Sequence, residues 1–536
     1  MHMGHTITMI PFMCRCRRLR ITLCMLMTAA AASNAPCEIR LPALISHGMV
    51  LQQGKKVNLW GTAEPGERIT AALDTHRASA LADQSGRWKV ELGPLNPGGP
   101  FTLTLAGGTN TIALRDVLVG DVWVCSGQSN MAMTVGPTRP PYFTGVMNYQ
   151  EELRNANYPR LRLFTVEKAV ASKPQRDVNG FWVAARPETV HDFSAVAYFF
   201  GRELLRVFDT PIGLINASLG STTAEAWTSR SALEADPAFR SILDREQAIL
   251  RPYPRVFREF EKQLTEWMHS SESAEADGRP IPAVPTIPVD PRQNPNRPAG
   301  LFNGMIAPLA SFAIRGVIWY QGESNSDRPA QYRKLFPTLI RDWRRAWRAD
   351  DLPFLFVQLA SWGIQYFQLN FPGLREAQAM ALSLPNTAMA VTTDIGDGTD
   401  GHPKNKQDVG YRLALAAQAI AYGRDVIYSG PVYDSMTVER GAIRVRFKNV
   451  YGGLTARNWP PGFRSGFEIA GADRRFVEAL VRIDGETVLV WSDLVTQPVA
   501  VRFNWKDNPW YHLYNRAGLP AAPFRTDDWA DALAPK

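Results

Sequence analysis

Cysteine and histidine are scarce in this sequence. Its 536 residues include five cysteines and eight histidines, and no two of them stand at the spacing that zinc sites use. The sequence therefore predicts no metal site. Only Cys37 and Cys125 follow the first 35 residues. Cys125 ends an apolar run, which favours a buried thiol over a disulfide.

The sequence also lacks a large excess of positive or negative charge. The formal net charge is +8, but the first 35 residues hold four arginines and no acidic residue, so the rest of the chain carries only +4. This excess is too small to indicate nucleic acid as a partner. The apolar run near the N-terminus, from Ile21 to Ala32, is shorter than the ~20 residues that span a bilayer. We expect no membrane span in the mature chain.

Residues 1–35 have the pattern of a cleaved signal peptide. A basic stretch from Arg15 to Arg20 precedes the short apolar run, and Ser33 and Ala35 supply small side chains at the positions that a signal peptidase reads. The predicted location is therefore secreted or periplasmic.

The rest of the chain divides into three zones. Residues 36–116 contain short strand-like segments broken by turns such as Pro65-Gly66, as in a β-sandwich. Residues 117–428 alternate apolar strands with helical stretches, which predicts a parallel α/β sheet. Residues 229–300 interrupt this rhythm with a charged helical part and a proline-rich part, so we interpret them as an insertion. Strand patterns return in residues 429–536.

The predicted fold class is α/β, with a helix-flanked parallel sheet inserted between N- and C-terminal β-sandwich segments. The expected strands of the parallel sheet are "DVWVC", "IGLINAS", "GVIWYQ", "FLFVQLA" and "AMAVTT". Apolar residues recur at helical spacing from Leu335 to Trp347 and from Val409 to Ile420, which predicts two helices. We expect the C-terminal strands to complete the sandwich that the N-terminal strands begin, with two separate β modules as the alternative.

Polar, glycine-containing loops follow four of the expected strands. "GQSN" begins at Gly127, "LGS" at Leu219, "QGESN" at Gln321 and "DIGDGTDGHP" at Asp394. Ligand sites form outside the carboxyl ends of parallel strands, so we interpret the four loops as parts of one site.

Together these loops contain the groups that acyl transfer from an ester requires. A serine needs a base to take its proton, and histidine titrates in the right range. The oxyanion of the tetrahedral intermediate needs preorganised donors, which glycine N–H groups or a side-chain amide supply. Ser129 is the candidate nucleophile, with Ser126 as its rival, and His402 is the candidate base, with His191 as a weaker one.

Several longer motifs resemble a known family. "VWVCSGQSNM", "WYQGESN" and "DIGDGTDGHPKNKQDVGYRLALAAQA" are similar to the bacterial sialate O-acetylesterase family of the SGNH hydrolase superfamily, as are "LFNGMIAPL" and "LYNRAGLPAAPFRTDDW". The resemblance implies an SGNH-hydrolase-like parallel sheet. It also implies that Ser129 is the nucleophile, that the N–H of Gly220 helps to bind the oxyanion, and that His402 is the base.

The side-chain oxyanion donor departs from the superfamily's pattern. That pattern has asparagine two residues after a glycine, where this sequence has Ser324. The donor is then either Gln321, which we prefer, or Asn325.

The acid that orients the histidine also departs from the pattern. Thr399 stands where the superfamily has aspartate, which leaves Asp400, Asp394 or a Ser-His dyad without an acid. We favour Asp400, because a nearby carboxylate stabilises an imidazolium better than a neutral acceptor does.

Substrate contacts are expected from Gln128, Glu323, Trp362 and Arg375. Trp362, like Tyr366, would stack on a sugar ring or else pack in the core. Arg375 would bind the carboxylate of a sialic acid or else join a helix salt bridge. Glu323 has the alternative of a buried, hydrogen-bonded structural role.

The function that the resemblance implies is that of a secreted carbohydrate O-acetylesterase. It would remove acetyl groups from sugars by serine acyl-enzyme chemistry and without a cofactor. Sialic acids are the expected substrates. Acetylated xylan-type plant oligosaccharides are the alternative substrate. A sugar-binding protein that no longer catalyses is the alternative from another class, and the intact set of Ser129, Gly220 and His402 favours the enzyme.

Overall fold

The computed structural model describes residues 38–530, except 109, 141, 364–368, 458 and 460–464. The predicted signal peptide, Cys37 and Tyr366 lie outside the described residues. All described residues belong to one compact unit. None of its described helices combines the length and the apolarity needed to cross a membrane.

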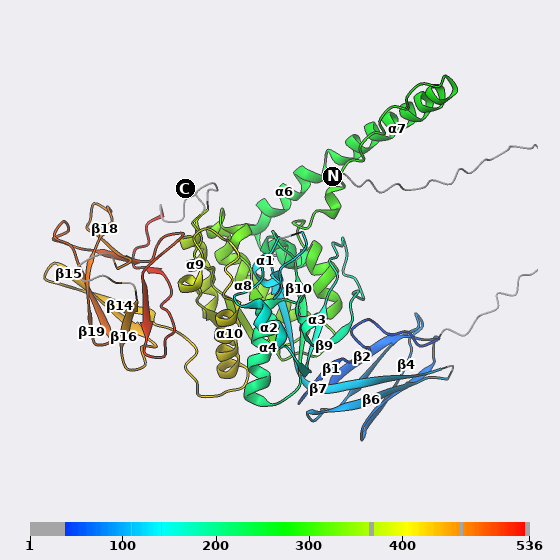
Figure 1. Ribbon diagram of the computed structural model, residues 1–536, viewed down its shortest axis with the longest axis horizontal. Coiled ribbons are helices and arrows are strands. Elements are labelled where there is room, and N and C mark those ends of the chain that lie inside the picture. The colour runs from blue at the N-terminus through cyan, green and yellow to red at the C-terminus, as the bar shows by residue number, and fades with distance from the viewer. Residues whose placement is uncertain are drawn as a thin grey trace, which may run out of the picture. The chain divides into compact units, whose positions relative to one another are not determined.

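A large sheet runs through this unit (Figure 1). Its main path has the order β13-β12-β11-β7-β10-β8-β9, and all neighbours on it are parallel except the edge pair β8 and β9. The strands are β7 (Thr111–Gly127), β8 (Tyr158–Thr165), β9 (Trp182–Ala185), β10 (Ile212–Ser218), β11 (Gly316–Tyr320), β12 (Phe354–Val357) and β13 (Thr387–Ala390). The predicted α/β class with a central sheet is therefore confirmed. The sequence analysis missed β8, in which arginines interrupt the apolar pattern, and the four-residue β9.

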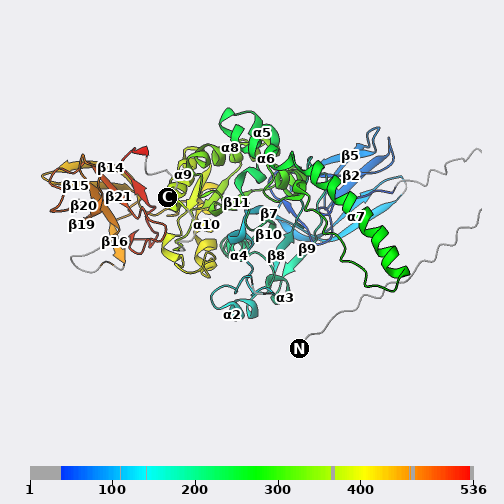
Figure 2. The ribbon, with the colours of Figure 1, turned by 90° about the horizontal axis from the view of Figure 1, so that it is seen from above.

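Helices cover both faces of the sheet. Figure 2 shows α8 and α4 on opposite sides of the central strands, while α9 contacts α8 and α10 contacts α4. The helices of this region are α1 (Ser129–Ala132), α2 (Tyr149–Arg154), α3 (Pro187–Val190), α4 (Ala195–Phe208), α8 (Pro329–Trp347), α9 (Phe371–Met380) and α10 (Lys406–Ile420). The two helices predicted from apolar spacing are confirmed as α8 and α10. Their periodic residues, such as Leu339 and Leu413, are buried because they face the sheet.

The long strand β7 joins the N-terminal strands to the parallel sheet. Its first half pairs with β1 (Val50–Gln52) and β6 (Gly98–Ala106), and its second half pairs with β10 and β11. The remaining N-terminal strands are β2 (Val57–Thr62), β3 (Arg68–Leu73), β4 (His76–Leu81) and β5 (Arg87–Leu92). Alternate side chains of β3 and β5 are buried, as expected for sandwich strands.

The C-terminal strands form sheets of their own. Two four-stranded sheets have the orders β14-β15-β20-β19 and β18-β17-β21-β23, and β16 pairs with β22. A separate apolar core that includes Ile443, Val488 and Phe503 lies among them. The strands are β14 (Val432–Glu439), β15 (Ala442–Lys448), β16 (Leu454–Arg457), β17 (Phe467–Ala470), β18 (Val477–Glu478), β19 (Leu480–Asp484), β20 (Thr487–Trp491), β21 (Ala500–Phe503), β22 (His512–Asn515) and β23 (Phe524–Arg525). The described C-terminal strands do not pair with the N-terminal ones, so the expected completion of the N-terminal sandwich is wrong and the pairings fit two separate β modules.

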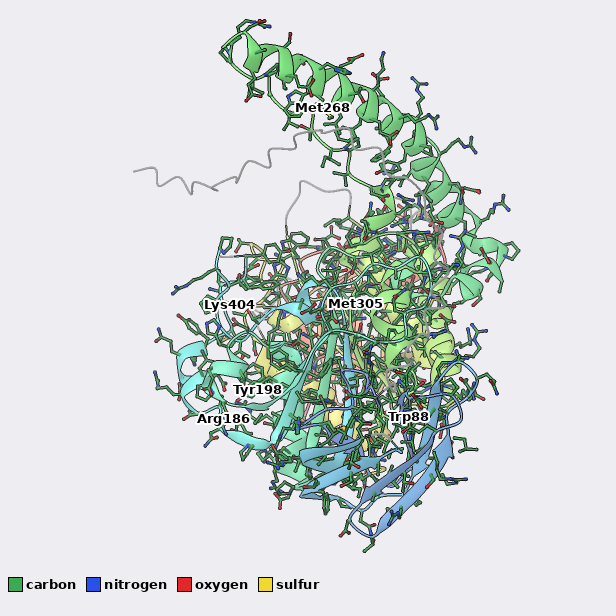
Figure 3. The ribbon with its side chains drawn as sticks, turned by 90° about the vertical axis from the view of Figure 1, so that its right-hand side faces the viewer. Trp88, Arg186, Tyr198, Met268, Met305 and Lys404 are labelled. Atoms are coloured by element: carbon green, nitrogen blue, oxygen red, sulfur yellow. The ribbon has the colours of Figure 1, made fainter. Side chains whose placement is uncertain are left out.

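The insertion between β10 and β11 is mostly helical. It contains α5 (Arg230–Glu234), α6 (Arg240–Leu250) and the 24-residue α7 (Tyr253–Ala276). Much of α7 is exposed, including apolar side chains such as Met268, which is labelled in Figure 3. The proline-rich segment that follows has one short 3-10 turn, Pro291–Gln293.

Buried ion pairing joins the end of the parallel sheet to α10 and to the C-terminal strands. Arg412 donates to both carboxylate oxygens of Asp394, at 2.6 and 2.7 Å, and Tyr514 donates to the same carboxylate at 3.2 Å. The side chains of Arg412 and Asp394 are only 8% and 3% exposed. Removing one partner would leave a buried charge without compensation.

We expect Asp394→Asn to lower the free energy of unfolding by about 3–5 kcal/mol, because Arg412 keeps its charge in a buried place. Urea unfolding followed by circular dichroism measures this change. The matched control is Asp244→Asn, which breaks the exposed pair of Arg240 and Asp244 and should cost about 1 kcal/mol or less. Equal stability of the two variants would contradict the structural role of Asp394.

Candidate active site

Three of the polar loops begin side by side at the end of the sheet. In the register of the parallel strands, Gly127 at the end of β7 is the partner of Ser218 on β10 and of Tyr320 on β11. The loops that start at residues 128, 219 and 321 therefore leave the sheet at the same level, as the sequence predicted.

Gly127 makes the sharp turn that presents Ser129. Its φ is +141°, and a Cβ at this position would lie 2.0 Å from the carbonyl oxygen of Tyr320, so only glycine fits. The chain then enters the short helix α1, whose first residue is Ser129. Ser129 is 6% exposed.

The backbone of Gly220 lies directly against Ser129. A Cβ added at Gly220 would be 3.3 Å from the Cβ of Ser129. Within the part of the chain that the structure describes, the N–H groups of Ser129 and Gly220 donate no hydrogen bond. The geometry thus brings together a serine hydroxyl and two available backbone donors.

The two expected side-chain donors are already engaged elsewhere. The Nε2 of Gln321 donates to the carbonyl of Thr222 at 3.1 Å and to Oδ1 of Asn325 at 2.7 Å. The Nδ2 of Asn325 donates to Glu225 at 2.9 Å. Gln321 and Asn325 are 0% and 1% exposed. This corrects the expectation that either amide donates to an oxyanion, because their hydrogen bonds join the second and third loops instead.

His402 lies on the fourth loop in a partly apolar setting. Its ring packs against Tyr142 and Phe143, with centroids 5.6 and 5.2 Å away, and its side chain is 24% exposed. Asp400 accepts a hydrogen bond from the backbone N–H of His402 at 2.8 Å. The same carboxylate oxygen lies 3.8 Å from Nδ1 of the ring, which is ion-pair range and too long for a hydrogen bond.

The other candidates for the acid, the nucleophile and the base are engaged elsewhere. Asp394 is paired with Arg412, so it does not orient His402. Ser126 is fully buried and donates to the carbonyl of Ala217. His191 is paired with its neighbour Asp192.

Asn130 connects the first loop to the third and fourth loops. Its Nδ2 donates to the carbonyl of Gly401 at 2.9 Å and to Glu323 at 2.6 Å. Its Oδ1 accepts a 2.6 Å hydrogen bond from Nζ of Lys406, the first residue of α10. The residue after Ser129 is therefore bonded to the residue before His402.

The sequence analysis assigned no role to Asn130 or Lys406, although both lie in motifs that it quoted. A lysine that follows a polar loop is usually solvated, so no local pattern marks it as buried. Lys406 is 0% exposed, and it lies four residues after His402 as the first residue of α10.

Burial shifts the pKa values of the charged groups around Asn130. Burial lowers the pKa of Lys406 to about 7, against the opposing pull of Glu323 and Asp400. Burial also raises the pKa of Glu323 above its usual range. For His402, burial and the nearby Lys406 cation lower the pKa, and Asp400 partly offsets them. A lowered pKa keeps the imidazole neutral, which is the form a general base needs.

The structure contradicts the expectation that Arg375 contacts the substrate. It is 0% exposed, and its guanidinium donates to the carbonyls of Leu359, Ala360, Lys506 and Asp507. Burial lowers the pKa of Arg375 to about 10. It therefore binds backbone carbonyls at the junction with the C-terminal strands, and neither a sugar carboxylate nor a helix carboxylate.

The other three side chains that were expected to contact the substrate interact with other parts of the protein. Gln128 is 3% exposed and accepts from the N–H groups of Gly322 and Ser324 at 3.3 Å, so it joins two loops and does not face a substrate. Glu323 accepts from Asn130, which matches its alternative structural role. Trp362 packs under the fourth loop, where a Cβ at Gly401 would lie 3.1 Å from its ring.

The chain is similar to several known carbohydrate esterases. A family model described as carbohydrate esterase, sialic acid-specific acetylesterase, matches residues 296–420, which include the third and fourth loops and Lys406. The sialate O-acetylesterase of Mus musculus is 32% identical over 448 residues, covering 76% of this chain and 78% of that protein. The sialate O-acetylesterase of Homo sapiens is 32% identical over 442 residues, covering 75% of each chain.

A solved structure has a similar fold. The crystal structure of a carbohydrate acetylesterase from Xanthomonas citri matches with a TM-score of 0.76 and 36% identity, covering 92% of this chain and all of that one. With identity above 30% over more than two thirds of both sequences, the protein belongs to the sialate O-acetylesterase family of carbohydrate esterases and is an ester hydrolase.

Proposed function

We propose that the protein is an exported carbohydrate O-acetylesterase in which Ser129 forms an acetyl-enzyme intermediate. The observation that carries this proposal is the hydrogen bond from Asn130 to Gly401, which ties the neighbour of the serine to the neighbour of the histidine. Export rests on the signal-peptide pattern of residues 1–35. The SGNH-hydrolase arrangement also stays part of the proposal, supported by the loops that meet at one edge of the sheet.

In the proposed reaction, the hydroxyl of Ser129 attacks the acetyl carbonyl and His402 takes its proton. Because Nδ1 of His402 faces Asp400, Nε2 is the nitrogen left for the serine. The N–H groups of Ser129 and Gly220 stabilise the oxyanion. The sugar hydroxyl leaves with the proton from His402. Water then attacks the acetyl-enzyme while His402 takes a proton from it, and acetate leaves as the proton returns to Ser129.

We assign a positioning role to Asn130, Lys406 and Glu323. Their hydrogen bonds cross-link three loops behind the serine and histidine. A displacement of the reacting groups by about 1 Å lowers the reaction rate about 100-fold. The hydrogen bonds between these loops therefore preserve activity by keeping Ser129 and His402 in place. The charge of Lys406 also keeps the pKa of His402 low.

The proposed substrates are sugars carrying acetyl esters, with sialic acids preferred. Support for sialic acids comes from the family description and from the names of the mammalian relatives. The carbohydrate acetylesterase of X. citri supports acetylated sugars without naming one, so acetylated xylan-type oligosaccharides remain the alternative. The small residues of the loops favour a short acyl group.

Ser129→Ala should abolish hydrolysis of an aryl acetate, because no other hydroxyl of the first loop is placed to attack. Release of 4-nitrophenol measures the rate, and thermal melting checks the fold. Ser126→Ala is the matched control, which removes the rival hydroxyl and a buried hydrogen bond worth about 1 kcal/mol but should retain activity. Activity of Ser129→Ala near that of the unmodified enzyme would rule the nucleophile out.

The rate should rise with pH through a pKa below 6.5, since His402 acts in its neutral form and burial lowers its pKa. Measuring kcat/KM between pH 4.5 and 8 tests this, and a flat profile would count against His402.

The variant Asp400→Asn distinguishes a Ser-His-Asp triad from a Ser-His dyad. A loss of several orders of magnitude indicates a triad, whereas a loss below about tenfold, or ~1.4 kcal/mol, indicates a dyad.

Lys406→Met should move the inflection of the pH profile upward, because it removes the cation that lowers the pKa of His402. We also expect a lower kcat, since Asn130 loses a donor. Lys404→Met is the control: this exposed lysine, labelled in Figure 3, lies two residues away and should leave the inflection in place. An unmoved inflection in Lys406→Met would contradict the electrostatic role.

A further inference from the structure

An exposed aromatic side chain lies next to the proposed base. Tyr142 is 60% exposed, and the centroid of its ring lies 5.6 Å from the centroid of the His402 imidazole. Single apolar side chains on a surface need no explanation by themselves. Tyr142 differs from them because its exposed ring packs against a residue that is proposed to transfer protons.

Phe143 supports the ring of Tyr142. The two rings pack edge to face, with centroids 4.6 Å apart, and Phe143 also packs edge-on against His402 at 5.2 Å. Edge-to-face contacts are a favourable geometry for aromatic rings. Phe143 is only 7% exposed. One ring is therefore buried against the imidazole, while its neighbour in the chain presents most of its surface to solvent.

Thr138 orders the loop that carries both rings, residues 133–147. Its hydroxyl oxygen accepts hydrogen bonds from the N–H groups of Tyr142 and Phe143 at 3.0 and 2.9 Å. Its own N–H donates to the carbonyl of Phe143 at 3.0 Å. Hydrogen bonds from a threonine side chain to nearby backbone stabilise turns, so the backbone at Tyr142 is fixed without a ligand.

Both ends of this loop are attached to the catalytic loops. At one end the chain continues directly from α1, whose first residue is Ser129. At the other end the N–H of Met147 donates to the carbonyl of Lys404, two residues after His402, at 3.1 Å. The loop therefore holds Tyr142 in a fixed place relative to the serine and the histidine.

Tyr142 lies on the side of the site from which the sugar leaves. In the proposed reaction the leaving sugar oxygen takes its proton from His402, so it comes within hydrogen-bond distance of Nε2, about 2.6–3.2 Å. The acyl group lies instead against Ser129 and the N–H of Gly220. A sugar bonded to the leaving oxygen is therefore next to the imidazole, where Tyr142 offers an apolar ring.

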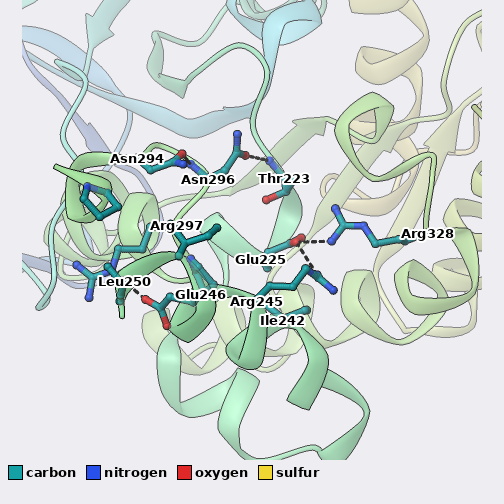
Figure 4. Close-up of a pocket in the computed structure, with 13 residues that line it drawn as sticks. Thr223, Glu225, Ile242, Arg245, Glu246, Leu250, Asn294, Asn296, Arg297 and Arg328 are labelled. Atoms are coloured by element: carbon teal, nitrogen blue, oxygen red, sulfur yellow. Dashed lines mark hydrogen bonds and ion pairs between the residues drawn. The ribbon is translucent and has the colours of Figure 1, made fainter. Parts of the chain in front are cut away.

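The pocket between the second loop and the insertion has a different kind of surface (Figure 4). None of the described residues that line it is aromatic. Its charged side chains pair with one another, Glu225 with Arg245 and Arg328, and Glu246 with Arg297. These pairs leave little to bind a sugar ring, in contrast to the aromatic surface beside the base.

We propose that Tyr142 binds the sugar part of the substrate, with the face of its ring stacked on a pyranose ring whose acetyl ester reaches Ser129. The proposal rests on the esterase function proposed above and identifies a side chain that recognises the leaving group. The C–H groups on one face of a pyranose pack on an aromatic ring as other apolar groups do. Tyr142 then selects for the alcohol that is released and not for the acyl group.

Tyr142→Ala tests this proposal. The measured quantity is kcat/KM for each acetylated sugar that the enzyme cleaves, an acetylated xylo-oligosaccharide or O-acetylated sialic acid, divided by kcat/KM for ethyl acetate, which has no ring. Loss of the aromatic contact predicts a roughly tenfold fall of this ratio. Tyr142→Phe keeps the ring and should stay within about threefold of the unmodified enzyme. The control is Tyr451→Ala, at an exposed tyrosine between β15 and β16, which should leave the ratio unchanged.

Equal losses on the sugar ester and on ethyl acetate would overturn the proposal, because Tyr142 would then act only by supporting His402. Equal falls of the ratio in Tyr142→Ala and Tyr142→Phe would also overturn it, because the hydroxyl and not the ring face would then bind the sugar. The relative rates on 4-nitrophenyl butyrate and 4-nitrophenyl acetate should stay constant in Tyr142→Ala. A change confined to these acyl groups would place Tyr142 on the wrong side of the site.

Saturation-transfer NMR with free xylotriose and free sialic acid separates this proposal from the esterase function, because it needs no turnover. A signal that the unmodified enzyme gives and Tyr142→Ala loses supports the stacking contact even if no sugar ester is cleaved. Equal signals from both proteins, or none from either, overturn it. Cleavage of ethyl acetate without cleavage of any sugar ester would instead refute the proposed function, while the NMR experiment still decides the contact.

Discussion

The parallel register of β7 with β10 and β11 is the constraint on which the site depends. It places Ser218 and Tyr320 on either side of Gly127, so three loops leave the sheet at one level. The backbone of β11 comes so close that no side chain fits at residue 127. The turn that follows sets Ser129 against Gly220. A shift of one residue in this pairing would separate the serine from the glycine, because neighbouring residues of a strand point to opposite faces.

Buried cations hold the loops from behind. Lys406 donates to Asn130, Arg412 binds Asp394, and Arg375 binds four backbone carbonyls. A buried cation is costly unless oxygen atoms surround it, so each of these residues restricts the backbone that it touches. The contacts of Arg375 and Arg412 reach Asp507 and, through Asp394, Tyr514, so the C-terminal strands help to hold the loops of the parallel sheet.

The insertion extends this edge of the sheet into a pocket. A bare strand end offers groups for chemistry but little surface to recognise a large substrate. Helix α6 and residues 291–298 add walls beside the second loop, and Asn296 attaches them to it.

Much of the fold was predictable from local pattern. The apolar runs of β10 and β11 and the periodic helices α8 and α10 have strong signals, because burial on both faces or on one stripe leaves a repeat in the sequence. β8 and β9 lacked such a signal. The long motifs around Ser129 and His402 indicated the family and the ester hydrolase class, and both are confirmed. The catalytic roles of Ser129, Gly220, His402 and Asp400 stay predictions.

The sequence by itself determined the α/β class, the family and the positions of the polar loops. Only the tertiary structure decided what each polar residue in those loops contacts. The amides of Gln321 and Asn325 could have bound an oxyanion, and the guanidinium of Arg375 could have bound a sugar carboxylate. Each of these side chains is instead buried and hydrogen-bonded to other parts of the chain. No local pattern marked Lys406 either, yet it is buried and donates to Asn130 beside the histidine's loop. Whether a polar group is free depends on donors and acceptors that distant segments bring to it, and no local pattern records them.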